Sequence, residues 1–141
     1  AYDDTTFYSR LVSGEANRVV AWDGWCNYGI AENPDIRFVV PEEGSDLWTD
    51  TMVVLKSSEN KEAAHAFINW VLAPENHQAV AELVYYKVPN GAAMEGLDPA
   101  LIEQFPNLGM SPAELLEEEQ LLDLGDDTAK YTEIVAQVTS G

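Results

Sequence analysis

Two short aromatic–acid elements of this sequence have the residue types needed to bind a cation. One is Trp22-Asp23-Gly24-Trp25, after the apolar run 19–21, and the other is Leu47-Trp48-Thr49-Asp50, before the apolar run 52–55. Each places an indole and a carboxylate at the end of an expected strand. An indole face attracts an ammonium group within about 6 Å for roughly 0.5–2 kcal/mol, and a carboxylate adds a charge-assisted hydrogen bond. The pattern predicts a site for a cationic, partly aliphatic ligand.

Each of these residues also has an ordinary structural interpretation. A tryptophan beside a strand packs in the core more often than it contacts a ligand. Asp50 could cap a backbone amide in a turn, and Asp23 could belong to an Asp-Gly turn. Trp25 and Tyr28 could line the edge of a cleft or pack in the core. The residue types alone leave these alternatives open.

The composition narrows the class of protein. A chain of 141 residues suffices for one domain, or for pieces of two lobes. Seven Lys and Arg against 25 Asp and Glu give a net charge of −18, which argues against nucleic-acid or anionic-membrane binding. We expect most of the acids to form a solvated surface. No apolar run is long enough to span a membrane. The first residues lack the features of a signal peptide, so we expect either that export is not used or that its signal lies outside this sequence.

No residue pattern in the sequence indicates catalysis. Cys26 is the only cysteine, which excludes an internal disulfide and predicts a small packed side chain. His65 and His77 lie on expected helices without metal or catalytic spacing, and we expect both to be exposed. Residues 123–127 lack the spacing of a calcium loop. The sequence therefore predicts a protein that is not an enzyme and that needs no cofactor or metal.

Helical patterns and helix-start signals recur along the chain. We expect helices over 4–12 and 26–32, a helix that begins after Asn60, and another opened by Pro74. Asp98-Pro99 and the capping box Ser111-Pro112-Ala113-Glu114 predict two further starts. The first of the two long apolar stripes is Ala64, Phe67, Ile68 and Val71, and the second is Tyr131, Ile134, Val135 and Val138.

Three apolar runs predict strands, over residues 18–22, 36–40 and 51–55. Strands that alternate with helices indicate an α/β fold. Three strands are few for this many helices, so the predicted sheet is incomplete. Unpaired strand edges favour a homodimer formed by edge pairing or strand exchange.

The order of several motifs resembles the extracytoplasmic spermidine/putrescine-binding proteins of ABC importers. The resemblance begins with residues 11–15 and 19–24. It continues with residues 40–44, which lead into Leu47-Trp48-Thr49-Asp50-Thr51. The run 60–69 and the Pro89-Asn90 turn continue it. Because these motifs occur in order over nearly all 141 residues, the resemblance is specific.

The resemblance implies a type II periplasmic-binding fold, in which two α/β lobes close on the ligand. It implies that this chain is the C-terminal part of such a protein, located in the periplasm. Residues 1–48 would belong to the second lobe, 49–97 to the first, and 98–141 would return to the second. A polyamine and an ABC permease would be its partners.

The resemblance also assigns roles to individual residues. Trp22 and Trp48 match aromatic residues that pack on the methylene chain of the polyamine, and Asp50 matches an acid that binds an ammonium group. Asp23 stands where the family also has asparagine. Leu121, next to Gln120, replaces a family glutamine, which suggests a different preference among amines. Trp25 and Tyr28 are additional candidates at the cleft.

Three functional hypotheses follow. The first is capture of spermidine or putrescine for an ABC importer. The second is a binding module of the same fold for another cationic amine or amino acid, for which an aromatic cage would matter more than paired acids. The third is a fragment without binding of its own, because the opposing lobe is missing.

Overall fold

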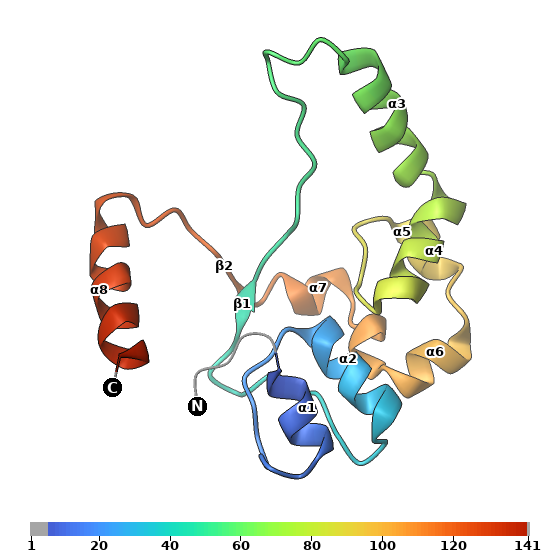
Figure 1. Cartoon of the computed structure of the whole chain (residues 1–141). Coiled ribbons are helices and arrows are strands. Elements are labelled where there is room, and N and C mark those ends of the chain that lie inside the picture. The colour runs from blue at the N-terminus through green and yellow to red at the C-terminus, as the bar shows by residue number, and fades with distance from the viewer. Residues whose placement is uncertain (1–5, 141) are drawn as a thin grey trace.

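Helices make up most of the regular structure in the computed structural model, which describes residues 6–140 (Figure 1). The α-helices are α1 Phe7–Val12, α2 Asp23–Glu32, α3 Lys61–Val71, α4 Pro74–Val84, α5 Gly91–Glu95, α6 Pro99–Gln104, α7 Pro112–Leu115 and α8 Thr128–Thr139. Two 3-10 helices, η1 Pro106–Gly109 and η2 Gly125–Asp127, complete the set. The helices predicted from the sequence all form, and α2 begins three residues before its predicted start. Residues 4 and 5 of the first predicted helix lie outside the described residues.

Local capping explains where the helices begin. The Ser111 Oγ accepts a hydrogen bond from Glu114 N at 3.2 Å, and Ser111 N donates to Glu114 Oε2 at 2.6 Å, so the predicted capping box is confirmed. Asp98 Oδ1 accepts from Ala100 N at 2.9 Å and caps α6. Pro74 occupies the first position of α4. Asn60 precedes α3 without a side-chain capping bond.

The sheet of the described residues consists of two short strands. β1 Asp46–Leu47 and β2 Glu119–Gln120 pair in parallel, with Asp46 opposite Glu119 and Leu47 opposite Gln120. Glu119 N donates to Ser45 O, and Leu121 N donates to Leu47 O, both at 3.1 Å. This pairing brings the segment before Trp48 beside a segment near the end of the chain.

The three predicted strands do not form in the described part of the chain, where residues 18–22, 36–40 and 51–55 take part in no sheet. A strand must exchange backbone hydrogen bonds with a neighbour, and none of the three segments has one there. Residues 36–40 still alternate as a strand would: Ile36 and Phe38 turn inward, and Arg37 and Val39 are exposed. The α/β prediction thus overestimated the strand content.

The core is divided between two clusters. In the first, Ile30 and Ile36 pack with Phe105 and Leu108. The second contains Ala81, Val88, Ala93 and Leu97. Leu101 packs against both clusters and links them.

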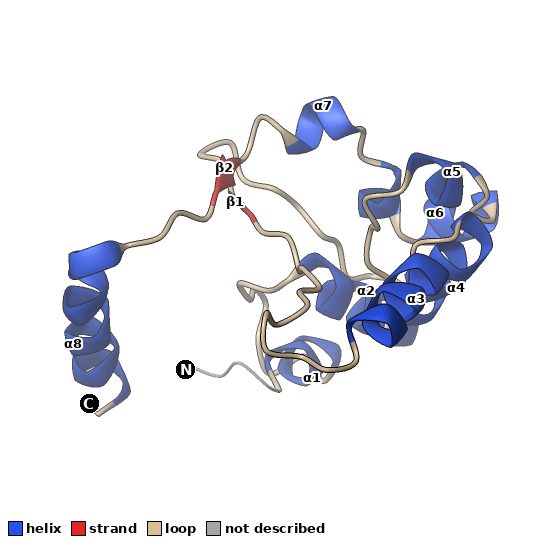
Figure 2. Cartoon of the chain, turned by 90° about the horizontal axis from the view of Figure 1, so that it is seen from above, coloured by secondary structure: helices blue, strands red, loops and turns tan. Residues whose placement is uncertain are grey.

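The apolar stripe of α8 is open to solvent, and that of α3 is half-buried apart from Phe67. Phe67 on α3 is 59% exposed, and Ile134 on α8 is 56% exposed. Every residue of α8 is exposed. Figures 1 and 2 show α8 set apart from the other helices, at the end of an extended connection from β2. An amphipathic helix needs a partner for its apolar face, and the described residues offer α8 none.

The burial predicted for Cys26 and the exposure predicted for His65 are found, but the exposure predicted for His77 is not. Cys26 is free and buried, as predicted, and His65 is exposed on α3. The prediction for His77 is wrong: its side chain is buried on α4, with Nδ1 unpaired. Because His77 lies one turn into α4 and faces the rest of the fold, helix position alone was a poor guide to its exposure.

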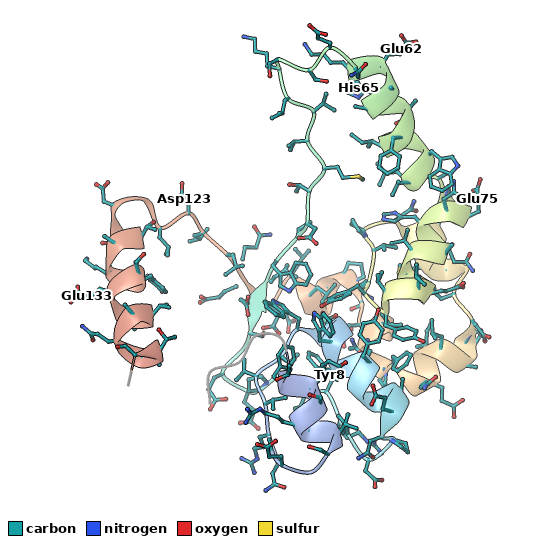
Figure 3. The ribbon with its side chains drawn as sticks, in the orientation of Figure 1. Tyr8, Glu62, His65, Glu75, Asp123 and Glu133 are labelled. Atoms are coloured by element: carbon teal, nitrogen blue, oxygen red, sulfur yellow. The ribbon has the colours of Figure 1, made fainter. Side chains whose placement is uncertain are left out.

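Charged side chains cover the outer surface. Glu62 on α3, Glu75 on α4 and Glu133 on α8 point away from the body of the chain (Figure 3). This agrees with the expectation that the excess of acids is solvated. Among the described residues, no helix is long and apolar enough to cross a membrane.

Candidate functional site

A contact between two aromatic rings joins distant parts of the chain at the candidate site. Trp48 directly follows β1, and Tyr86 lies two residues beyond the end of α4. Their ring centroids are 5.5 Å apart with an interplanar angle of 76°, an edge-to-face arrangement. Tyr85, which ends α4, has a left-handed backbone with φ of 55° and turns the chain so that Tyr86 leaves the helix.

The same tyrosine packs against the first turn of α2. The Tyr86 ring lies so close to Gly24 that a Cβ added at this position would overlap the ring. Glycine is therefore the residue that permits this approach, and the Asp23-Gly24 pair has a packing function. Tyr86 thus connects the Trp22-Asp23-Gly24-Trp25 element to Trp48.

Asp23 is held in a partly buried polar environment beside this contact. Its Oδ2 accepts a hydrogen bond from Asn107 Nδ2 at 3.4 Å. Burial raises the pKa of Asp23 above its usual value, opposed by hydrogen bonds from the Gly24 backbone and Asn107 and by the positive charge of Lys87. A carboxylate that is short of solvent gains much from a cation that approaches it.

Lys87 supplies positive charge near the site and fastens η1 to it. Its Nζ donates to Leu108 O at 2.8 Å and also to Met110 O. Burial lowers the pKa of Lys87, while the nearby Glu114 and Asp23 oppose this shift.

Burial and nearby acids both raise the pKa of the Tyr86 hydroxyl. Its pKa rises to about 12, mainly through burial and then through the negative charge of Asp23, with a smaller contribution from Asp50. The phenol is therefore neutral at physiological pH. Trp48 and the start of α2 at Asp23-Gly24 thus meet at Tyr86, and Asp50 follows Trp48 by two residues in an exposed segment.

Trp22 lies on another side of the α2 start. It has an extended backbone, with φ of −66° and ψ of 143°, and it is 45% exposed. Its ring contacts Phe7 at 6.1 Å between centroids, whereas that of Trp48 contacts Tyr86. Asp50 is exposed in the segment after Trp48. A sandwich of a methylene chain between Trp22 and Trp48 stays a prediction.

Trp25 and Tyr28 belong to a row of rings between α1 and α4. Trp25 lies 5.4 Å from Tyr8 and 5.5 Å from Tyr28, and Tyr28 lies 5.2 Å from Tyr85, all between ring centroids. A pocket of about 380 Å³ is lined by Tyr8, Trp25 and Tyr28 together with Glu32, Val84 and Tyr86.

Sequence reasoning missed Tyr86 and Asn107 as members of the site. Tyr86 stands just before the predicted Pro89-Asn90 turn, so an aromatic residue at that turn was an available signal. Asn107 gave no signal in the sequence, because its partner Asp23 is distant along the chain.

Leu121 is 66% exposed, and its backbone N donates a hydrogen bond to the carbonyl oxygen of Leu47, the residue before Trp48. No three His, Cys, Asp or Glu side chains gather in a metal-binding arrangement within residues 6–140.

Comparison with known proteins defines the class. Residues 5–108 match the family model described as bacterial extracellular solute-binding protein. This chain belongs to that family. No solved structure matches it significantly.

Several named relatives bind spermidine, putrescine or agmatine according to their names. The spermidine/putrescine-binding periplasmic protein of Salmonella typhimurium (strain LT2) is 29% identical over 141 residues, covering 100% of this chain and 40% of the relative. That of Escherichia coli (strain K12) is 31% identical over 99 residues, 70% of this chain and 28% of the relative. The putrescine/agmatine-binding protein of Pseudomonas aeruginosa (strain PAO1) is 27% identical, covering 87% of this chain and 33% of the relative. The chain thus spans about 40% of the length of the Salmonella relative.

Proposed function

We propose that this chain binds a linear polyamine, spermidine or putrescine, as part of the substrate-binding component of an ABC importer. The ligands in the names of its relatives support this proposal, and so does the word periplasmic in the names of the Salmonella and Escherichia relatives. The permease of such an importer would be its protein partner. The observation that carries the proposal is the packing of Tyr86 against both Trp48 and the Asp23-Gly24 start of α2, which joins the two aromatic–acid elements of the sequence.

These residues have complementary roles in amine capture. Asp50 would bind one ammonium group in the cleft, and Asp23, whose carboxylate is poorly solvated, would neutralise another. Trp48 offers an indole face for the methylene chain and for cation–π attraction. Trp22 would cover the chain from the other side once the lobes close. No bond is made or broken, so the function needs neither a nucleophile nor a metal.

The proposed fold is the two-lobed type II arrangement. Residues 1–48 and 98–141 would belong to the second lobe and 49–97 to the first. The division of the core supports this, since one cluster joins Ile30 and Ile36 to Phe105 and Leu108, and the other lies within 81–97. In a protein as long as these relatives, the three apolar runs 18–22, 36–40 and 51–55 would pair with strands from the part that this chain does not cover.

A thermal melt with and without spermidine tests the proposal, with Mg²⁺ as a cation control. A ligand that binds the folded state raises its melting temperature, so spermidine should raise it and Mg²⁺ should not. Asp50→Ala should weaken spermidine binding by about 2–5 kcal/mol, because an ammonium group in the cleft loses its counter-charge. Asp35→Ala, at an exposed turn, is the matched control.

The outcomes separate the site from the fold. A cooperative melt that spermidine leaves unmoved would contradict polyamine binding by this chain. Unchanged affinity in the Asp50→Ala variant would contradict the assignment of Asp50 while leaving amine binding in place.

A further inference from the structure

A pocket is lined by Tyr8, Trp25, Tyr28, Glu32, Val84 and Tyr86, and neither Asp23 nor Asp50 is among its lining residues. Trp25, Tyr28 and Glu32 stand at positions i, i+3 and i+7 of α2 and form one stripe along it. Asp23 and Glu32 are the first and last residues of the helix, about 2.5 turns apart, so their side chains point in opposite directions. The pocket is therefore separate from the acid pair of the proposed polyamine site.

Aromatic rings form the walls of this pocket at different angles. Tyr8 and Trp25 are inclined by 30°, and Trp25 and Tyr28 by 53°. Tyr8 comes from α1, on the side that faces α2 (Figure 3). Val84 and Tyr86 close the pocket from the end of α4. The volume, about 380 Å³, falls within the range of small-molecule sites.

The charge of the residues that line the pocket favours a cationic ligand. Glu32 is the one charged side chain that lines the pocket, so no Lys or Arg of the described residues offsets it there. The faces of the four aromatic rings add negative electrostatic potential. The hydroxyl of Tyr28 lies 3.4 Å from the backbone oxygen of Leu83, which holds this ring toward α4.

We infer that this pocket is a second ligand site, specific for an organic monocation with an ammonium head and a short carbon chain. The ammonium group sits among the rings, within reach of the Glu32 carboxylate, and the carbon chain packs on Val84. A neutral molecule of the same shape lacks the cation–π and carboxylate interactions and binds more weakly. The inference does not depend on the roles proposed for Asp23 and Asp50, because neither carboxylate lines the pocket. Tyr86 belongs to both sites, and the inference gives Trp25 and Tyr28 to this pocket instead of the polyamine cleft.

Indole NMR signals of the full chain provide a direct readout. The four tryptophans give four indole N–H resonances, and the resonance missing in Trp25→Phe identifies that of Trp25. n-Butylammonium should shift the Trp25 resonance in a saturable manner, and n-butanol, its neutral isostere, should shift it much less. Asp50→Asn should leave this response unchanged, which separates the pocket from the polyamine site.

Two variants test the roles of the lining residues. Glu32→Gln should weaken n-butylammonium binding about twofold to fivefold, the usual value of an exposed charge pair. Tyr28→Leu should weaken it about twofold to thirtyfold through loss of the cation–π contact. Glu62→Gln, at an exposed helix position on α3, is the matched control and should have no effect.

Three results would overturn the inference. They are an n-butylammonium titration that leaves Trp25 unshifted, an equal response to n-butanol, and undiminished affinity in Glu32→Gln. The first two are measured on the unsubstituted chain, so they decide the question even if Tyr28→Leu does not fold.

Discussion

The ring of Tyr86 lies against the backbone of Gly24 so closely that no side chain fits between them. This contact seats the ring on the first turn of α2, beside Asp23, while its edge-to-face partner Trp48 approaches from β1. The geometry of the candidate site therefore depends on a residue with no side chain.

Gly24→Ala should destabilise the fold and disturb the site. The added Cβ overlaps the middle of an aromatic ring, and overpacking of this kind costs about 1–3 kcal/mol. The free energy of unfolding, measured with urea, should fall by that amount, and the fluorescence of Trp48 should change as Tyr86 moves.

Gly29→Ala on the same helix is the matched control. Its Cβ would meet Ile36 Cδ1 at 3.6 Å, an ordinary van der Waals contact, so helix propensity should raise stability by about 0.5–1 kcal/mol. Equal effects of the two substitutions would contradict the importance of the Gly24–Tyr86 contact.

Asp23→Asn should stabilise the free protein at neutral pH while it weakens amine binding. Burial raises the pKa of Asp23, so between its unfolded and folded values the folded state binds more protons than the unfolded state. The free energy of unfolding therefore falls as pH rises through this window, and the loss persists above it. Asparagine keeps the shape of the side chain and removes this dependence.

Melting temperatures from pH 3 to pH 8 measure this effect. The advantage of Asp23→Asn over the parent should be largest at neutral pH and should shrink as the pH falls below the folded-state pKa of Asp23. Asp126→Asn, which removes an exposed carboxylate on η2, controls for the change in net charge. An advantage that does not vary with pH would disprove the linkage.

Lys87→Met should lower the free energy of unfolding by about 1.5–3 kcal/mol. Lys87 Nζ donates to the carbonyl oxygens of Leu108 and Met110, and hydrogen bonds from charged groups contribute at this level. Urea unfolding provides the measurement. Lys56→Met, in the exposed segment before α3, should change stability little, and a similar loss there would point to a general charge effect.

Helix starts were predictable from the sequence because their causes are local. The Ser111–Glu114 capping box and the Asp98 cap act within one turn, and their hydrogen bonds are those expected from residue type. Strand pairing is not local. The apolar run 51–55 has the composition of a strand, yet Val53 is 77% exposed and the run has no partner in the described residues.

The candidate site divides in the same way. Trp48 and Asp50 stood out because an indole and a carboxylate lie together in the sequence. Tyr86 follows α4 and Asn107 belongs to η1, so only the folded chain shows that they contact Trp48 and Asp23. Whether Trp22 and Trp48 enclose a ligand is a question for the binding experiment.

Helix α8 should be the least protected helix in hydrogen exchange. All its residues are exposed, and an isolated helix of this length is marginal in water. Its amides should exchange much faster than those of α2 and α4, which carry core residues. Val135→Pro should therefore leave the main melting transition unchanged, whereas Ala81→Pro should abolish it, because Ala81 is completely buried in α4. Protection of α8 that grows with protein concentration would instead show that its apolar stripe packs against a second copy of the chain.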